Sequence, residues 1–164
     1  MRTIYLIRHA KSSWDNPTLR DFQRPLNERG LTIAPQMAAL LKRENEIPDL
    51  MVSSPAKRAL ETAQFFAAAN GIGEEHIQLE EDIYEASPVQ LLRVISRLPE
   101  TAGCIFLFGH NPSFTEVANL YSAKAIDNIP TCGIVRIDTT AAVWSEMYEG
   151  NARVVKTWFP KEVL

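Results

Sequence analysis

The sequence has few cysteines and histidines, and it has no long apolar run. Its 164 residues include only two cysteines, Cys104 and Cys132. Neither has the C-x-x-C spacing of a metal or redox site, and neither begins a C-x5-R phosphatase loop. Both are therefore expected to be small buried apolar side chains. No stretch approaches the ~18 apolar residues that cross a bilayer, and Arg8 comes too early for a signal peptide, so a cytoplasmic protein is expected.

The chain also has no large excess of positive or negative charge. The chain has 17 lysines and arginines against 20 aspartates and glutamates, for a net charge of -3. Proteins that bind nucleic acid or anionic membranes neutralise many phosphates at once, which needs a broad basic surface. The balance therefore predicts neither a nucleic-acid nor a membrane partner, and it requires any anion site to be local.

Apolar strands alternate with amphipathic helices through the first 120 residues. Such alternation predicts one α/β domain over residues 1–164, with a three-layer α/β/α arrangement and a mostly parallel central sheet. The expected strands are residues 3–7, 49–53, 77–79 and 104–108. Helices are expected from Gly30 to before Pro48, over 55–69 with Ser54 as N-cap, from Pro88, and from Pro112 with Asn111 as N-cap. Residues 133–138, 142–147 and 153–158 predict an antiparallel addition at the C-terminal end.

Two of the three histidines follow directly after predicted central strands. His9 ends the first strand and His110 ends the strand at 104–108, whereas His76 lies in a polar connection and is expected at the surface. Ligands of α/β sheets collect at the carboxyl ends of the strands. Arg8 precedes His9, and Arg58 lies in the first turn of a predicted helix, where backbone N–H groups already favour an anion. Each histidine alone is equally well explained as a structural residue, but the four together indicate a phosphate pocket.

The common motifs of other phosphate and hydrolase sites are missing. The chain has no G-x-x-x-x-G-K-[ST], no H-E-x-x-H, no G-x-S-x-G and no G-x-G-x-x-G. A dinuclear metal site would need several carboxylates beside the histidines, and the two arginines would oppose the metals. No metal and no cofactor are therefore expected. Arginine binds phosphoryl oxygens bidentately, and an imidazole is a nucleophile toward phosphorus.

Three ordered sequence blocks resemble the histidine phosphatase superfamily, which has the phosphoglycerate-mutase-like fold. They are R-H-A-K-S at residues 8–12, S-S-P-A-K-R-A-L-E-T-A at 53–63 and G-H-N-P at 109–112. The first block, with the R-P-L loop at residues 24–26, is most similar to the SixA-like phosphohistidine phosphatases. The blocks span roughly residues 4 to 116, which makes the resemblance far more specific than the R-H dipeptide.

The resemblance implies a role for each matching residue. His9 would be the nucleophile, and Arg8, Arg58 and His110 would hold the phosphoryl group, with Arg24 and Asn111 as further phosphate-binding residues. His9 must be neutral to attack, with its other ring nitrogen donating to a loop carbonyl, while His110 is more useful as a cation. Glu81, in the acidic segment that follows the second block, is the candidate general acid, although a solvated acidic turn explains it equally well.

The short chain favours a protein substrate. Only about 50 residues separate Arg58 from His110, which leaves little room for a helical lid over a small metabolite. The leading hypothesis is a phosphatase acting on phosphohistidine in a partner protein, such as a phosphotransfer domain or phosphocarrier. The alternatives are a phosphomonoesterase acting on small phosphorylated metabolites and a phosphate-binding module without turnover. Trp14 and Phe22, in the loop after His9, are expected to pack in the core, with substrate contact as the alternative.

Overall fold

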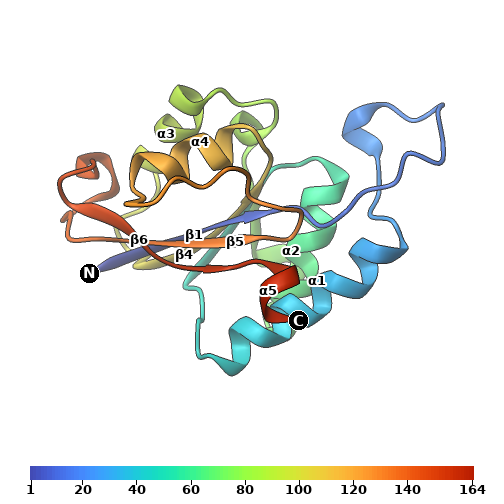
Figure 1. Ribbon diagram of the computed structural model, residues 1–164, viewed down its shortest axis with the longest axis horizontal. Helices are drawn as coiled ribbons and strands as arrows, with labels where there is room; N and C mark the ends of the chain where they lie inside the picture. The colour runs from blue at the N-terminus through green and yellow to red at the C-terminus, as the bar shows by residue number, and fades with distance from the viewer.

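The computed structural model describes residues 1–164 and places six strands in one sheet (Figure 1). The strand order is β3-β2-β4-β1-β5-β6. The first four strands in that order are parallel, and β5 runs antiparallel to both of its neighbours. The strands are β1 (Arg2–Arg8), β2 (Leu50–Ser53), β3 (Ile77–Leu79), β4 (Cys104–Gly109), β5 (Ile134–Thr139) and β6 (Ala152–Trp158). The predicted three-layer α/β fold with a mostly parallel sheet and an antiparallel C-terminal addition is confirmed.

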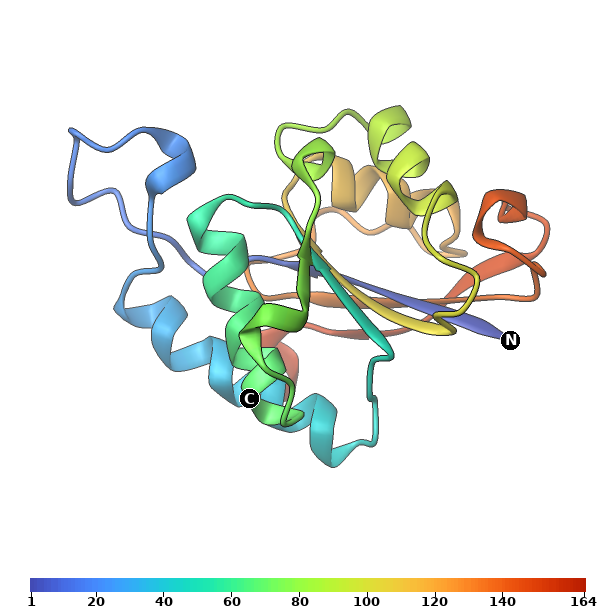
Figure 2. The same cartoon turned by 180° about the vertical axis from the view of Figure 1, so that it is seen from behind.

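Helices cover both faces of the sheet (Figures 1 and 2). One face packs against α1 (Glu28–Arg43) and α2 (Lys57–Ala69), and the other against α3 (Pro88–Ser96) and α4 (Ser113–Leu120). Alternate residues of a strand point to opposite faces, so Tyr5 and Ile7 enter the α1/α2 core while Ile4 and Leu6 enter the α3/α4 core. The short helix α5 (Pro160–Val163) ends the chain beside α1. No helix is long and apolar enough to cross a membrane.

The pairing of β1 with β4 brings the two strand-end histidines together. The strands run parallel with Arg8 opposite Gly109, and the backbone N–H of His9 donates to the Gly109 carbonyl oxygen at 3.0 Å. The residues that follow the two strands therefore leave the same sheet edge side by side. The connection from β1 to α1 extends from this edge and is the blue loop at the right of Figure 1.

Four local predictions were wrong. Helix α1 begins at Glu28, two residues before the expected Gly30, and the Asn27 side chain caps it by accepting from the Gly30 N–H. Residues 142–147 form no strand, because Trp144 lies in a 3-10 helix (Trp144–Glu146) and is buried, with its indole N–H donating to the Ala102 carbonyl. Helix α2 begins at Lys57 with Ala56 as its N-cap, and the Ser54 hydroxyl accepts from the Ala56 N–H just before the helix. Helix α4 begins at Ser113, one residue later than expected. The two cysteines are free; Cys132 is buried as predicted and Cys104 is half-buried.

Candidate active site

The two histidines form the centre of a buried polar cluster. The ring centroids of His9 and His110 are 5.3 Å apart, and each residue is only 8% exposed. His76 lies in a 3-10 helix (Glu74–His76) and is exposed, as predicted. The sheet therefore brings together the two histidines that the sequence placed at strand ends and leaves the third at the surface.

His9 is held in one tautomer. Its Nδ1 lies 2.7 Å from the Ala10 carbonyl oxygen, and because a carbonyl can only accept, Nδ1 carries the proton. Nε2 has no hydrogen-bond partner in the protein, so its lone pair is available. Burial lowers the pKa of His9 to about 4; the bond to Ala10 opposes this shift, and the charge of Arg58 adds to it. The predicted hydrogen bond from His9 to a loop carbonyl is present, and burial favours the predicted neutral ring.

Burial also favours the neutral form of His110, and its predicted role as a cation that holds phosphate stays a prediction. Burial lowers its pKa to about 3, and the neighbouring His9 and Arg58 lower it further. Its Nε2 lies 2.8 Å from the Ser54 hydroxyl oxygen. Its Nδ1 is buried and has no partner. The sequence indicates that His9 and Arg58 lie near His110. It does not indicate that His110 is buried, and burial is what favours its neutral form.

Two arginines supply positive charge beside the histidines. Arg58, at the second residue of α2, is 7% exposed, and Arg8 is half-buried at the end of β1. Burial and the charge of Arg58 lower the pKa of Arg8. Arg8 donates from Nη1 to the Ile129 carbonyl at 2.9 Å, while its buried Nε has no partner. Two of the three buried polar side-chain atoms without a partner, Arg8 Nε and His110 Nδ1, thus belong to this cluster, an arrangement suited to an anion.

The loop after β1 contributes Asp21, which the sequence analysis missed. Its carboxylate accepts from Arg24 Nη1 at 2.9 Å, from Arg58 Nη2 at 3.0 Å and from the Tyr84 hydroxyl at 2.7 Å. Burial raises the pKa of Asp21, but the three hydrogen bonds prevail and hold it at about 2. Asp21 thereby ties the loop to α2. The only available signal was an acidic residue three positions before Arg24.

Tyr84 is the second residue that sequence reasoning missed. Its ring packs edge-on against His110, with centroids 5.6 Å apart, and its hydroxyl bonds to Asp21. Burial and the bond to Asp21 raise the pKa of Tyr84 to about 12, so the phenol keeps its proton. Because its hydroxyl donates to Asp21 and its ring packs on His110, Tyr84 helps to hold both residues in place.

Arg24 is buried and fully engaged with its own loop. Nε donates to the Ser13 carbonyl at 3.0 Å, Nη1 donates to Asp21 and Nη2 donates to the Ser12 hydroxyl. Each of its three nitrogens therefore already bonds to the protein. In this structure Arg24 organises the loop that carries Asp21, in addition to placing a positive charge near His9, whose pKa it lowers.

The side chain of Asn111, predicted to bind phosphate, makes four hydrogen bonds within the protein. Its Nδ2 donates to Asn128 Oδ1 and to the Ile129 carbonyl, both at 2.9 Å. Its Oδ1 accepts from the Thr115 hydroxyl at 2.8 Å and from the Thr115 N–H at 3.3 Å. These four bonds use the full capacity of the amide. Asn111 thereby fixes the backbone at Ile129, whose carbonyl also accepts from Arg8.

Glu81 is the predicted residue that the structure does not join to the others. It lies in the 3-10 helix Glu81–Ile83 after β3, and its side chain is exposed and makes no hydrogen bond or ion pair. Its acidic neighbours Glu80 and Asp82 pair with Arg97 instead.

Trp14 and Phe22 are not core residues, so that prediction was wrong. Trp14 is 76% exposed and Phe22 is 37% exposed. The guanidinium of Arg24 stacks on the Trp14 ring, 3.2 Å from its centroid, and Phe22 packs edge-on against Tyr84. Both aromatic side chains therefore lie on the surface of the loop, Trp14 in contact with Arg24 and Phe22 in contact with Tyr84.

The arrangement combines an available imidazole nitrogen with buried positive charge. A phosphoryl group matches both features, because its oxygens pair with guanidinium groups and its phosphorus accepts a nitrogen nucleophile. No group of three or more His, Cys, Asp or Glu side chains is arranged to hold a metal ion.

Comparisons with known proteins agree with this geometry. The sequence pattern of the histidine phosphatase superfamily (branch 1) matches residues 4–90. An uncharacterized chloroplastic protein of Arabidopsis thaliana is 30% identical over 156 residues, covering 90% of this chain and 71% of that protein. A structure from Agrobacterium tumefaciens, proposed to be the phosphohistidine phosphatase SixA, has 29% identity and a TM-score of 0.79, covering 96% of this chain and 97% of that one. A protein histidine phosphatase SixA complexed with tungstate shares the fold at 16% identity, with a TM-score of 0.81 and 98% of both chains covered. The chain therefore belongs to the histidine phosphatase superfamily.

Proposed function

We propose that this protein hydrolyses phosphohistidine on a partner protein through a covalent phosphoenzyme on His9. The observation that carries the proposal is the state of His9. Its Nδ1 is held by the Ala10 carbonyl, its pKa is lowered to about 4, and its Nε2 is unprotonated and free of protein partners. A nucleophile needs such a lone pair at neutral pH.

Two displacements complete the reaction. In the first, His9 Nε2 attacks phosphorus, and the P–N bond to the substrate imidazole breaks; its electron pair stays on the departing nitrogen, and because the other ring nitrogen carries a proton taken from solvent, the substrate leaves as neutral imidazole. In the second, a water oxygen attacks phosphorus and releases its proton to solvent. The P–Nε2 bond then breaks, phosphate leaves and His9 is regenerated. Both transition states spread negative charge over the phosphoryl oxygens, where fixed positive charge lowers the barrier.

Arg8, Arg58 and His110 would hold the phosphoryl oxygens. Arg58 uses one N–H of each terminal nitrogen on Asp21, at 2.8 Å and 3.0 Å, which leaves three N–H groups for the substrate. Arg8 contributes its unpartnered Nε. A phosphoryl dianion beside His110 favours the charged imidazole, so His110 would gain its proton when the substrate binds. Arg24 and Asn111 would act by fixing the surrounding loops.

The leaving group determines whether a general acid is needed. A phosphohistidine ring that is protonated on its other nitrogen leaves as a neutral imidazole, whereas an alkoxide leaving from a phosphomonoester is strongly basic and requires a proton donor. Glu81 is the candidate donor, but it makes no contact with the cluster in this structure. We therefore expect Glu81→Gln to leave phosphohistidine hydrolysis unchanged and to slow hydrolysis of phosphomonoesters.

The surface beside the site supports a protein substrate over a metabolite. The exposed Trp14, stacked on Arg24, offers an apolar surface next to the cluster. A phosphorylated side chain presented by another protein fits this arrangement.

The test is a comparison of substrates. The enzyme is incubated with phosphohistidine-bearing phosphotransfer and phosphocarrier proteins and, separately, with a panel of phosphorylated metabolites. Released phosphate should match the loss of protein-bound phosphohistidine; His9→Ala should abolish the reaction, and the exposed control His76→Ala should retain it. Fast hydrolysis of a metabolite with no action on any phosphohistidine protein would establish the phosphomonoesterase alternative. An unchanged rate in His9→Ala would refute the mechanism.

A further inference from the structure

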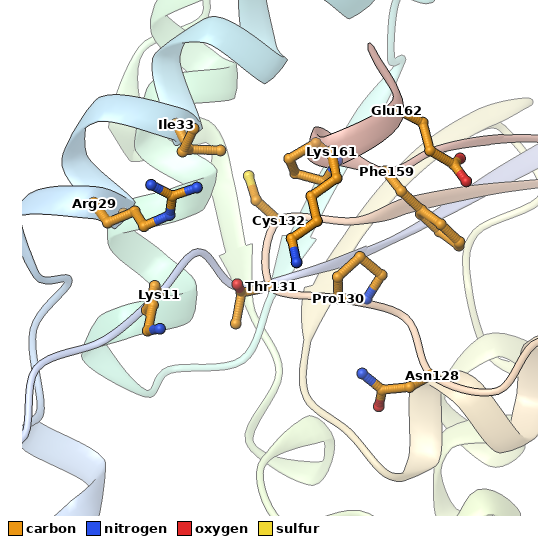
Figure 3. Close-up of a pocket in the computed structure, with 12 residues that line it drawn as sticks. Lys11, Arg29, Ile33, Asn128, Pro130, Thr131, Cys132, Phe159, Lys161 and Glu162 are labelled. Carbon is orange, nitrogen blue, oxygen red and sulfur yellow. The ribbon is translucent and has the colours of Figure 1, made fainter. Parts of the chain in front are cut away.

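A second cationic site lies behind the loop that carries His9. It is a cavity of about 380 Å³ between the first turn of α1, residues 128–132 and the C-terminal residues 159–162. Figure 3 shows the nitrogen ends of Lys11, Arg29 and Lys161 around Thr131, while the Glu162 carboxylate points away from them. Ile33, Pro130 and Phe159 add an apolar wall. The cavity therefore combines three positive charges with apolar surface.

These three cations have no partner within the protein. The side chains of Lys11, Arg29 and Lys161 are exposed and make no hydrogen bond or ion pair, whereas Arg24, Arg58, Arg97 and Arg136 are all paired with carboxylates. Glu162 is the only acidic residue that lines the cavity. In a protein with a net charge of -3, a local group of unpaired cations attracts a negatively charged ligand.

The cavity shares its wall with the candidate active site. The Cys132 N–H donates to the His9 carbonyl at 3.0 Å, and the Ile129 carbonyl accepts from Arg8 Nη1. Lys11 follows His9 by two residues, and its carbonyl accepts from the Asn27 N–H at the start of α1. One backbone segment thus contacts the phosphoryl-binding residues on one side and lines the cavity on the other. The cavity and the candidate active site are therefore separated by a single backbone segment.

Packing at Gly30 keeps this wall in place. A β-carbon at Gly30 would overlap the carbonyl oxygen of Lys11, so only glycine allows α1 to approach the backbone of the loop this closely. The position of Lys11 relative to Arg29 is therefore set by backbone contact, although both side chains reach into solvent.

We propose that this cavity is a docking site for acidic side chains of the phosphorylated protein substrate. The inference rests on the proposed function and adds the chemistry by which the partner is recognised. Three exposed cations on long side chains around an apolar wall suit carboxylates that neighbour apolar residues on a polypeptide. In contrast, Arg58 is buried, Arg8 is half-buried, and both are held by hydrogen bonds to the protein. Contacts between exposed charges steer association and are weakened by salt.

Binding is measured without turnover. Two unphosphorylated peptides with a central histidine, one flanked by Asp and Glu and one by Asn and Gln, are titrated into isotopically labelled protein while amide NMR shifts are followed. The acidic peptide should move the Thr131 and Cys132 signals and bind about tenfold more tightly, since each exposed charge pair contributes only a few-fold. The triple variant Lys11→Gln, Arg29→Gln, Lys161→Gln should bind both peptides equally. The matched variant Lys42→Gln, Arg93→Gln, Arg153→Gln, which removes three exposed cations elsewhere, should behave as wild type.

The same peptides in phosphohistidine form separate the two proposals. The docking site predicts a higher kcat/KM for the acidic peptide, lost in the triple variant, with the neutral peptide hydrolysed equally by both proteins. Hydrolysis of both peptides at equal rates, together with equal binding, would overturn the docking site and leave the proposed function intact. If neither peptide is hydrolysed but the binding preference holds, the phosphohistidine assignment fails and the docking site for acidic side chains stands.

Discussion

The buried neutral state of His9 and His110 makes the stability of the protein depend on pH. In the unfolded chain both imidazoles titrate near their ordinary pKa of 6.5, whereas in the fold their pKa values are about 4 and about 3. Below pH 6.5 the unfolded chain therefore binds protons that the folded protein does not. Since protonation then favours unfolding, stability is complete above pH 6.5 and is lost as the pH falls toward 4.

The size of the effect follows from the two pKa differences. At pH 5 an unfolded histidine is almost fully protonated while both folded histidines remain neutral. Relative to pH 8, each histidine then costs about 2 kcal/mol, and the pair costs about 4 kcal/mol. Both side chains are 8% exposed, so solvent screening reduces this little. The carboxylate of Asp21, with a pKa of about 2, does not titrate in this window. The loss is a large part of the 5–15 kcal/mol that stabilises an ordinary domain.

The assay is urea denaturation at a series of pH values between 8 and 5, followed by tryptophan fluorescence from the buried Trp144 and Trp158. The double variant His9→Asn, His110→Asn removes both titrating groups and should lack the loss of about 4 kcal/mol. His76→Asn removes the exposed histidine and should retain it. A wild-type free energy of unfolding that stays constant from pH 8 to pH 5, or one that falls equally in the double variant, would refute the buried neutral pair.

Three further predictions concern the residues around the histidines. Arg58→Ala removes a guanidinium that faces the transferring group, and kcat/KM for a phosphohistidine peptide should fall about 10²–10³-fold; a change below threefold would exclude Arg58 from the phosphoryl site. Tyr84→Phe deletes a donor to Asp21, so carboxyl NMR titration should show the pKa of Asp21 rising from about 2 toward its ordinary 3.8, and an unchanged value would contradict the network. Gly30→Ala forces a methyl group onto the Lys11 carbonyl and should destabilise the protein by about 3 kcal/mol in thermal denaturation. Gly103→Ala places its methyl group at an ordinary contact distance from Asp49 and should have little effect. Equal melting temperatures for the two variants would contradict the tight packing at Gly30.

The placement of the site is readable from the sequence because it depends on strand ends. The apolar runs before His9 and His110 identify parallel central strands, and parallel strands deliver their following residues to one edge of the sheet. The family blocks then add Arg58. Local patterns are enough for this part, since neither the register nor the packing of the strands has to be known.

The rest depends on contacts between segments that are distant in the chain. Asp21 joins the active site only because the loop folds back onto α2, 37 residues away, and its spacing from Arg24 gives no sign of that contact. Trp14 looks apolar in sequence but is stacked on Arg24 at the surface. The amide of Asn111 is engaged by Thr115 and Asn128, and burial favours the neutral form of His110. Each of these outcomes requires knowledge of what packs against the side chain.

Trapping the phosphoenzyme tests directly whether His9 is the nucleophile. The protein is mixed with a phosphohistidine peptide, quenched rapidly in alkali and examined by peptide mass spectrometry. Nucleophilic attack by His9 predicts phosphate on the peptide that contains His9, stable in alkali and lost in acid, and none in His9→Ala. Phosphate on another residue, or full turnover with no phosphate trapped on His9 at any quench time, would contradict the central claim.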